Sequence, residues 1–132
     1  MSAQERKKIV KKIFQFIMQG RPKDSLPYFA QKCKQHNPYV KGGMDALFDS
    51  MSAVQREPPK FSDPYFSIKR IIADGNMVAA HTEMLFSNSK PREGGLRQAH
   101  LFKFGKRNKV VEYWDITQMV DSKMPNPEGA FF

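Results

Sequence analysis

The stretch Val110-Val111-Glu112-Tyr113-Trp114-Asp115-Ile116-Thr117-Gln118 decides how the rest of the chain is interpreted. Its β-branched and aromatic residues are typical of a β-strand, and we expect a strand over residues 109–118. A carboxylate in a strand is costly if it is buried without a partner. Asp115 therefore either faces solvent or lies in a cavity that uses it.

The alternation of this strand predicts which of its side chains share a face. Asp115 lies on the same face as Tyr113 and Val111. Trp114 and Ile116 lie on the opposite face. In an apolar cavity, loss of hydration would raise the pKa of Asp115 and make it a usable general base. The alternative is a carboxylate that only holds the shape of the pocket through a hydrogen bond to the backbone or to an arginine.

Upstream of this strand, the sequence predicts helices followed by an antiparallel meander. We expect helices over residues 3–19, from 24 or 25 to 30, and over 44–55, with a loop or short strand within 33–40. Strands are expected over residues 65–73, 77–87 and 96–104, with a hairpin turn at Asp74-Gly75. Residues 89–95 are expected to form a loop and residues 120–132 an irregular tail, in which Phe131 and Phe132 pack against the domain. This order indicates an α+β class, in which helices cover a twisted sheet that encloses a pocket.

Length and composition set the broad class. The chain has 132 residues, enough for one hydrophobic core, and we expect a single domain over residues 1–132. Its net charge of +9 permits binding to nucleic acid, anionic lipid or acidic ligands. The basic residues are scattered and no nucleic-acid recognition motif is recognisable, so we expect a solvated basic surface and no nucleic-acid partner.

The number of cysteines and the hydropathy of the chain indicate the cellular compartment in which the protein is expected. Cys33 is the only cysteine, which excludes an intramolecular disulfide and fits a reducing compartment. The N-terminal segment is interrupted by charged residues, and no apolar run reaches the length of a membrane span. We expect a cytoplasmic protein without a membrane span.

The sequence has no strong motif for a metal, a phosphate or a catalytic triad. His36, His81 and His100 lack the close spacing of metal ligands. Gly94-Gly95 precedes a predicted strand and not a helix, so the geometry that cradles a phosphate is missing. We expect neither a metal nor a cofactor.

Several short motifs follow one another along the chain. They are Gln35-His36-Asn37-Pro38, Gly42-Gly43, Ala73-Asp74-Gly75 followed by Met77-Val78-Ala79-Ala80-His81, Leu101-Phe102-Lys103-Phe104, the strand from Lys109 to Gln118, and Asn126-Pro127-Glu128-Gly129-Ala130-Phe131. Their order resembles the SnoaL-like branch of the nuclear-transport-factor-2-like superfamily, from about Phe14 onward. The resemblance implies a cone-shaped fold, with helices packed on a curved antiparallel sheet that encloses a pocket, and it implies a homodimer.

The resemblance also implies catalytic residues. Characterised SnoaL-like enzymes are polyketide cyclases that close a ring by intramolecular aldol condensation without metal or cofactor. Their pocket uses an aspartate on the last strand as acid/base, with a histidine on the preceding strand nearby. In this chain those positions correspond to Asp115 and His100. Where many relatives have a histidine before the Trp-Asp pair, this chain has Tyr113, which removes a titratable base.

The remaining candidates are expected to contact a substrate. They are His36 and Asn37 in the segment after the second helix, and Tyr113, Phe102 and His81 on the strands. Asn37 could equally be a turn residue before Pro38, and His81 could serve packing. The expected function is a cofactor-independent acid/base enzyme, an aldol-type cyclase or isomerase, acting on a small apolar or carbonyl-containing molecule. The alternative is a non-catalytic ligand-binding or dimeric interaction module with the same fold.

Overall fold

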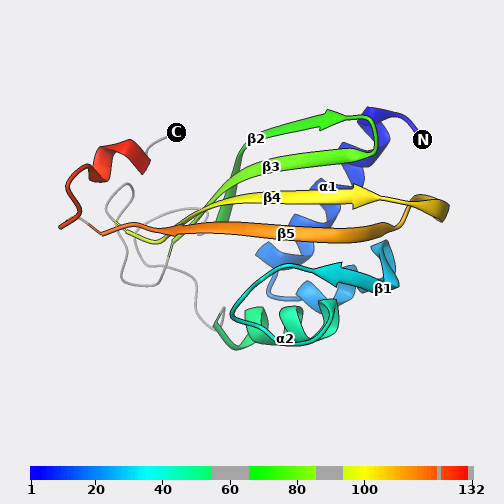
Figure 1. Cartoon of the computed structure of the whole chain (residues 1–132), viewed down its shortest axis with the longest axis horizontal. Helices are drawn as coiled ribbons and strands as arrows, with labels where there is room; N and C mark the ends of the chain where they lie inside the picture. The colour runs from blue at the N-terminus through cyan, green and yellow to red at the C-terminus, as the bar shows by residue number, and fades with distance from the viewer. Residues whose placement is uncertain (55–65, 86–93, 122, 131–132) are drawn as a thin grey trace.

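The computed structural model describes residues 1–54, 66–85, 94–121 and 123–130. The elements, in chain order, are α1 (Ala3–Met18), the 3₁₀ helix η1 (Pro22–Tyr28), β1 (Phe29–Gln35), α2 (Met44–Val54), β2 (Phe66–Asp74), β3 (Met77–Met84), β4 (Leu96–Phe104), η2 (Lys106–Asn108), β5 (Val110–Met119) and η3 (Pro127–Ala130). Figure 1 shows a five-stranded sheet curving around α1 and α2. The predicted α+β class, with helices packed on a curved and mostly antiparallel sheet, is confirmed.

Helix α1 forms where the sequence predicts a helix over residues 3–19. Ser2 caps it, because its Oγ accepts a hydrogen bond from the Glu5 backbone N–H at 3.2 Å. Gly20 follows the helix with a φ of +74°, a left-handed conformation that favours glycine. The buried face of α1 consists of Val10, Ile13, Phe14 and Ile17. Neither α1 nor any other helix in the described residues has the length and apolar character that a membrane crossing requires.

The sheet has the strand order β1-β5-β4-β3-β2. Strands β2 to β5 pair antiparallel in sequence order, whereas β1 pairs parallel to β5. The hairpin predicted at Asp74-Gly75 is confirmed: Asp74 pairs with Met77 across a two-residue turn in which Gly75 has a φ of +57°. Strand β4 has the predicted bounds, and β5 starts and ends one residue later than predicted.

Strand β1 is the element that the sequence describes least well. The expected short helix through Ala30 is instead the 3₁₀ helix η1, and the strand begins at Phe29. Phe29 and Cys33 are the two buried residues of β1, a four-residue spacing that looks helical in the sequence. Gln31, which regular alternation would bury with them, is exposed, and the pairing register between β1 and β5 shifts in this stretch, between Phe29 and Lys34.

Some of the sequence predictions concern residues that lie outside the described part of the chain. These are the last residues of the strand predicted over 77–87, most of the loop predicted over 89–95, and the packing of Phe131 and Phe132. The described part of the C-terminal tail contains η3 and no strand, in agreement with the expected irregular tail.

The two faces of the sheet differ in burial, as β3 shows. Val78, Ala80, Thr82 and Met84 are buried on one face, here called the inner face, which packs against the helices. His81 and Glu83 lie on the opposite, outer face. This alternation also decides where each candidate residue of β4 and β5 lies, because paired residues in an antiparallel sheet share a face.

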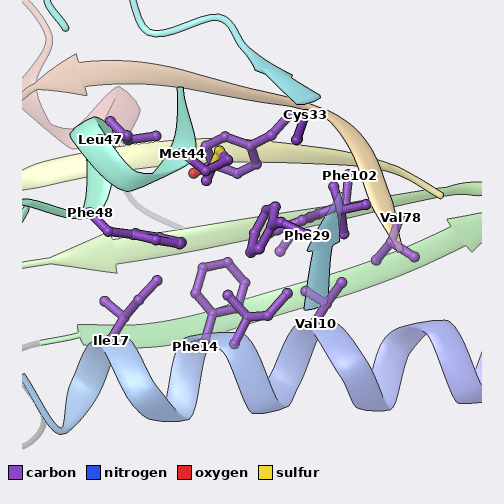
Figure 2. Close-up of a cluster of buried hydrophobic side chains, with 14 of the residues drawn as sticks. Val10, Phe14, Ile17, Phe29, Cys33, Met44, Leu47, Phe48, Val78 and Phe102 are labelled. Atoms are coloured by element: carbon purple, nitrogen blue, oxygen red, sulfur yellow. The ribbon is translucent and has the colours of Figure 1, made fainter. Parts of the chain in front are cut away.

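The hydrophobic core lies between the inner face and the helices. Figure 2 shows Val10, Phe14 and Ile17 of α1 and Met44, Leu47 and Phe48 of α2 converging on this face. The Phe14 ring lies 5.2 Å from that of Phe66, 5.8 Å from that of Phe102 and 5.0 Å from that of His100, measured between centroids. Burial of one such aromatic side chain contributes roughly 1.5–3 kcal/mol. The core thus extends up to the side chains of the candidate site.

Candidate functional site

A cavity of about 180 Å³ lies between α2 and the inner face of the sheet. It is lined by Asn37, Leu47, Ser50, Met51, Met84, Leu96, Gln98, His100, Tyr113 and Asp115. Cavities of about 150 Å³ accept a benzene ring. The cavity therefore has room for one six-membered ring.

A larger groove of about 560 Å³ lies next to this cavity, and the two spaces are open to solvent to a similar degree. The groove shares Asn37, Leu96, Gln98 and Asp115 with the cavity and continues along Ile116, Thr117 and Met119 of β5. A ligand with a ring in the cavity could extend substituents into this groove. Asp115 lies at the junction of the two spaces.

The pairing of β4 with β5 brings the polar residues of the cavity together. His100 pairs with Asp115 and Phe102 pairs with Tyr113, so all four side chains are on the inner face. Trp114 lies on the outer face. The structure therefore places Asp115 in a cavity and not in open solvent.

The carboxylate of Asp115 is only half satisfied by protein groups. Its Oδ2 accepts a hydrogen bond from Asn37 Nδ2 at 2.9 Å. Its Oδ1 is buried and has no hydrogen-bond partner among the described residues. Burial raises the pKa of Asp115, and the hydrogen bond from Asn37 opposes this rise. A carboxylate with one free oxygen beside apolar walls is suited to accept a proton.

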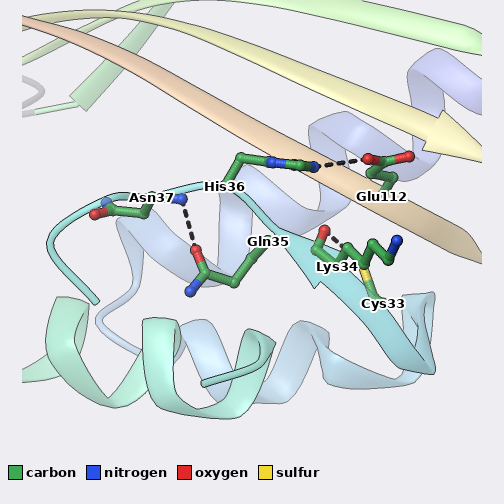
Figure 3. Close-up of polar contacts among 6 residues, drawn as sticks. All are labelled: Cys33, Lys34, Gln35, His36, Asn37 and Glu112. Atoms are coloured by element: carbon green, nitrogen blue, oxygen red, sulfur yellow. Dashed lines mark hydrogen bonds and ion pairs between the residues drawn. The ribbon is translucent and has the colours of Figure 1, made fainter. Parts of the chain in front are cut away.

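Asn37 is held in place by hydrogen bonds within its own loop. Its backbone N–H donates to Gln35 Oε1 at 2.7 Å (Figure 3), and its Oδ1 accepts from the Tyr39 backbone N–H at 2.8 Å. Gln35 Nε2 in turn donates to the carbonyl oxygens of Val40 and Gly42 at 2.8 and 3.0 Å. The loop after β1 is therefore cross-linked through Gln35, which leaves the amide of Asn37 to face Asp115.

The His100 side chain makes its hydrogen bonds to Tyr113 and Thr82 and not to Asp115, although the two residues are strand partners. Its Nδ1 lies 2.6 Å from Tyr113 Oη, and its Nε2 lies 3.0 Å from Thr82 Oγ1. Complete burial lowers the pKa of His100 to about 3, so the ring is neutral near pH 7. Both ring nitrogens are used by hydroxyl groups on other strands. Neither ring nitrogen of His100 is therefore left for a direct hydrogen bond to Asp115.

Tyr113 lines the cavity between His100 and Asp115. It is almost fully buried, with 4% of its surface exposed. Burial, together with the negative charge of Asp115, raises the pKa of Tyr113 well above its usual value. Its hydroxyl is therefore protonated throughout the physiological range and is available for hydrogen bonding.

His36 lies on the outer face and does not line the cavity, contrary to expectation. Its ring stacks on Trp114 with centroids 4.7 Å apart and an interplanar angle of 3°. Its Nε2 lies 2.7 Å from Glu112 Oε2 (Figure 3). The parallel pairing of Gln35 with Tyr113 explains this placement, because the next residue, His36, then lies beside Trp114.

His81 and Phe102 also lie away from the cavity. His81 is on the outer face of β3, where Arg70 lies 2.5 Å from its Nδ1, and burial together with the Arg70 charge lowers the pKa of His81. Phe102 is on the inner face, but it packs against Phe14 in the core and not along the cavity wall. Of the predicted site residues, the structure thus brings together Asp115, His100, Tyr113 and Asn37.

Several residues in or next to the cavity were not predicted from the sequence. Gln98 follows from the alternation of β4, because it lies two residues before His100 on the same face. Leu47 and Met51 of α2 have the helical spacing of core residues, and no local signal separates a cavity wall from a core. Thr82 is recognisable only through the hydrogen bond that it makes to His100. In the part of the chain that the structure describes, no three metal-ligating side chains are grouped as an ion would require.

The curved sheet, the helices inside it and the cavity between them define a cone-shaped fold of the nuclear-transport-factor-2-like class. The chain belongs to the SnoaL-like domain family, whose model matches residues 10–113. This match confirms the resemblance inferred from the motifs. It ends at Tyr113, just before Asp115, and no curated protein matches the sequence.

Solved structures with the same fold have diverse activities in their names. A putative hydroxylase, AclR, from Streptomyces galilaeus superposes with a TM-score of 0.68 at 14% identity, covering 89% of this chain and 91% of that one. A steroid delta-isomerase from Pseudomonas aeruginosa gives 0.62 at 11% identity, covering 95% and 85%. The epoxide hydrolase/cyclase-like enzyme SalBIII gives 0.63 at 19% identity, covering 87% and 92%. At these identities the likeness establishes the fold, and relatives with this fold include cyclases and isomerases.

Proposed function

We propose that the chain binds a small carbonyl compound in this cavity and that Asp115 acts on it as a general base without a cofactor. The observation that carries the proposal is the buried Asp115 Oδ1, which has no hydrogen-bond partner among the described residues. The walls around it include the apolar side chains of Leu47, Met51 and Met84. An apolar environment that raises the pKa of a carboxyl group brings it closer to the value that a general base needs near neutral pH.

The chemistry follows from the position of the free oxygen. Asp115 Oδ1 takes a proton from the carbon next to the carbonyl group, and the electron pair of the broken C–H bond moves to the carbonyl oxygen. The resulting enolate either attacks a second carbonyl carbon, which closes a ring, or is reprotonated at another carbon, which isomerises the compound. These two outcomes correspond to the cyclase-like and isomerase names of structures that share the fold.

Exchange of a carbonyl compound's α-protons in D₂O tests the proposal without knowledge of the natural substrate. Cyclohexanone is a suitable probe because the cavity has room for one ring. The wild-type protein is expected to accelerate the exchange, followed by NMR. Asp115→Asn should lower the accelerated rate by roughly 10²–10⁴-fold, since it removes the base and keeps the shape.

Asp45→Asn is the matched control, because Asp45 is an exposed carboxylate on α2 and does not line the cavity. It should exchange like the wild type. Wild-type exchange rates in Asp115→Asn would contradict the proposed role of Asp115. If the wild type binds cyclohexanone without accelerating exchange, the alternative of a non-catalytic ligand-binding module holds.

We also propose that the chain forms a homodimer in the cytoplasm. Ile72 and Ile116, 59% and 58% exposed, both lie on the outer face of the sheet, where a second copy would cover them. The buried thiol of Cys33, the only cysteine, supports a reducing compartment. Sedimentation velocity of the wild type and of Ile116→Lys checks the assembly: the wild type should sediment as a dimer and the variant as a monomer.

A further inference from the structure

Three hydrogen-bonded side chains connect the core to the cavity wall. Thr82 Oγ1 lies 3.0 Å from His100 Nε2, and His100 Nδ1 lies 2.6 Å from Tyr113 Oη. Thr82 has no exposed surface and does not line the cavity, whereas both His100 and Tyr113 line it. The neutral imidazole carries a proton on only one of its two nitrogens. The three groups must therefore donate in one direction along the chain.

The two directions leave different protons without an acceptor. If Tyr113 donates to Nδ1, then Nε2 donates to Thr82, and the Thr82 hydroxyl proton has no acceptor among the described residues. If Thr82 donates to Nε2, then Nδ1 donates to Tyr113, and the remaining free proton is on the Tyr113 hydroxyl. A hydroxyl proton without an acceptor is costly at a site that has no contact with solvent. At Tyr113 the cavity can supply an acceptor.

The charge beside the cavity favours the same direction. Asp115 pairs with His100 on β4, and the negative charge of Asp115 acts on the Tyr113 hydroxyl. A carboxylate attracts the proton end of a hydroxyl group and repels its lone pairs. Tyr113 therefore directs its proton toward the Asp115 side of the cavity and its lone pairs toward His100.

We propose that the Tyr113 hydroxyl donates a hydrogen bond to a carbonyl oxygen of the ligand, and that His100 is the positioning residue that fixes this direction through its Nδ1–H tautomer. The presence of a carbonyl ligand rests on the proposed function, whereas the tautomer is a property of the free protein. When Asp115 removes the α-proton, the negative charge that develops on the carbonyl oxygen is stabilised by the Tyr113 hydroxyl. His100 acts without contacting a reacting atom.

The tautomer of His100 is measurable by ¹⁵N NMR without any ligand. The chain has three histidines, so the double variant His36→Gln/His81→Gln leaves His100 as the only imidazole. We expect protonated Nδ1, unprotonated Nε2 and no charged form between pH 5 and pH 8. A protonated Nε2 as the main form, or an imidazolium in this range, would overturn the inference.

Variants of Thr82 test whether it sets the direction. Thr82→Val removes the hydroxyl donor and keeps the size of the side chain, and Thr82 does not line the cavity. We expect the Nε2–H form to appear in Thr82→Val and to remain absent in Thr82→Ser, which keeps the donor. An unchanged tautomer in Thr82→Val would contradict the role assigned to Thr82.

A pair of probes of similar shape tests the hydrogen bond to the ligand. Cyclohexanone carries a carbonyl oxygen where methylenecyclohexane carries a CH₂ group. Tyr113→Phe should lose roughly tenfold in affinity for cyclohexanone and keep its affinity for methylenecyclohexane, as measured by NMR titration. Equal losses for both probes would overturn the inference. If neither probe binds to the wild type, the proposed function fails, and the tautomer measurement still decides the hydrogen-bond direction.

Discussion

Strand β5 carries two clusters of similar composition on its opposite faces. The clusters differ in burial and in the charge of the groups that their histidines contact. On the inner face, Tyr113 and Asp115 lie beside His100. On the outer face, Glu112 and Trp114 lie beside His36. His100 is buried to 1% exposure and contacts neutral hydroxyls, whereas the His36 side chain is 39% exposed and contacts a carboxylate.

The difference between the two clusters comes from solvent and not from residue type. Each has a histidine, a carboxylate and an aromatic ring. On the inner face, loss of hydration lowers the pKa of His100 and raises the pKa of Asp115, so both groups shift toward their neutral forms. On the outer face, water screens the His36–Glu112 contact. Burial turns such residues into a candidate site, while exposure leaves a surface contact.

The largest effect is expected when the inner histidine is removed. His100→Ala leaves a void beside Phe14 and deprives both Thr82 and Tyr113 of their hydrogen-bond partner. We expect a loss of about 3 kcal/mol in the free energy of unfolding, measured by urea denaturation at pH 7. A loss below about 1 kcal/mol would mean that the inner cluster is no more important for stability than a surface contact.

The second largest effect is expected on acidification, which should lower the free energy of unfolding through the buried His100. The pKa of His100 is about 3 in the folded protein, below the 6.5 of a free histidine, so the unfolded chain binds more protons between these values. The contribution of His100 to stability is complete above pH 6.5 and falls by about 1.4 kcal/mol per pH unit below it. Urea denaturation at pH 7, 6 and 5 measures this slope.

His100→Phe is the control for the acid dependence, because it keeps a buried ring and removes the titrating group. Between pH 6.5 and pH 5, the free energy of unfolding of His100→Phe should fall less steeply than that of the wild type. The difference in slope should be about 1.4 kcal/mol per pH unit. His36 and His81 are present in both proteins, so their contributions cancel in the difference. Parallel slopes for the two proteins would show that His100 is not the origin of the effect.

The smallest effect is expected at the outer cluster. His36→Ala removes a partly exposed stack on Trp114 and a solvent-screened contact with Glu112. We expect a loss of about 1 kcal/mol or less in the free energy of unfolding, and the loss should shrink in 0.5 M salt. A loss as large as that of His100→Ala would remove the contrast between the two faces.

The inner face of β5 could be predicted from the sequence because its information is local. The alternation of one strand places Asp115 with Tyr113, and the short turn before β5 places His100 on the neighbouring strand. The hairpin at Asp74-Gly75 could be predicted for the same reason, because residues next to one another in the chain encode the turn. Helix α1 likewise follows from the spacing of its own apolar residues.

The outer cluster and β1 could not be predicted, because they depend on pairing between distant segments. Whether His36 faces the cavity or Trp114 is decided by the register of β1 on β5, which local residues do not encode. The exposed Gln31 interrupts the alternation between the buried Phe29 and Cys33 and hides the strand. The partner of His100 was also missed, since the choice between Asp115, Thr82 and Tyr113 depends on side-chain positions within an already formed sheet.

The hydrogen bond between Asn37 and Asp115 joins residues that are 78 positions apart in the chain. Closing so long a loop is among the slower events of folding, because its entropy cost must be met before the contact forms. The candidate site is therefore assembled late, after β5 has been synthesised and has paired with β1.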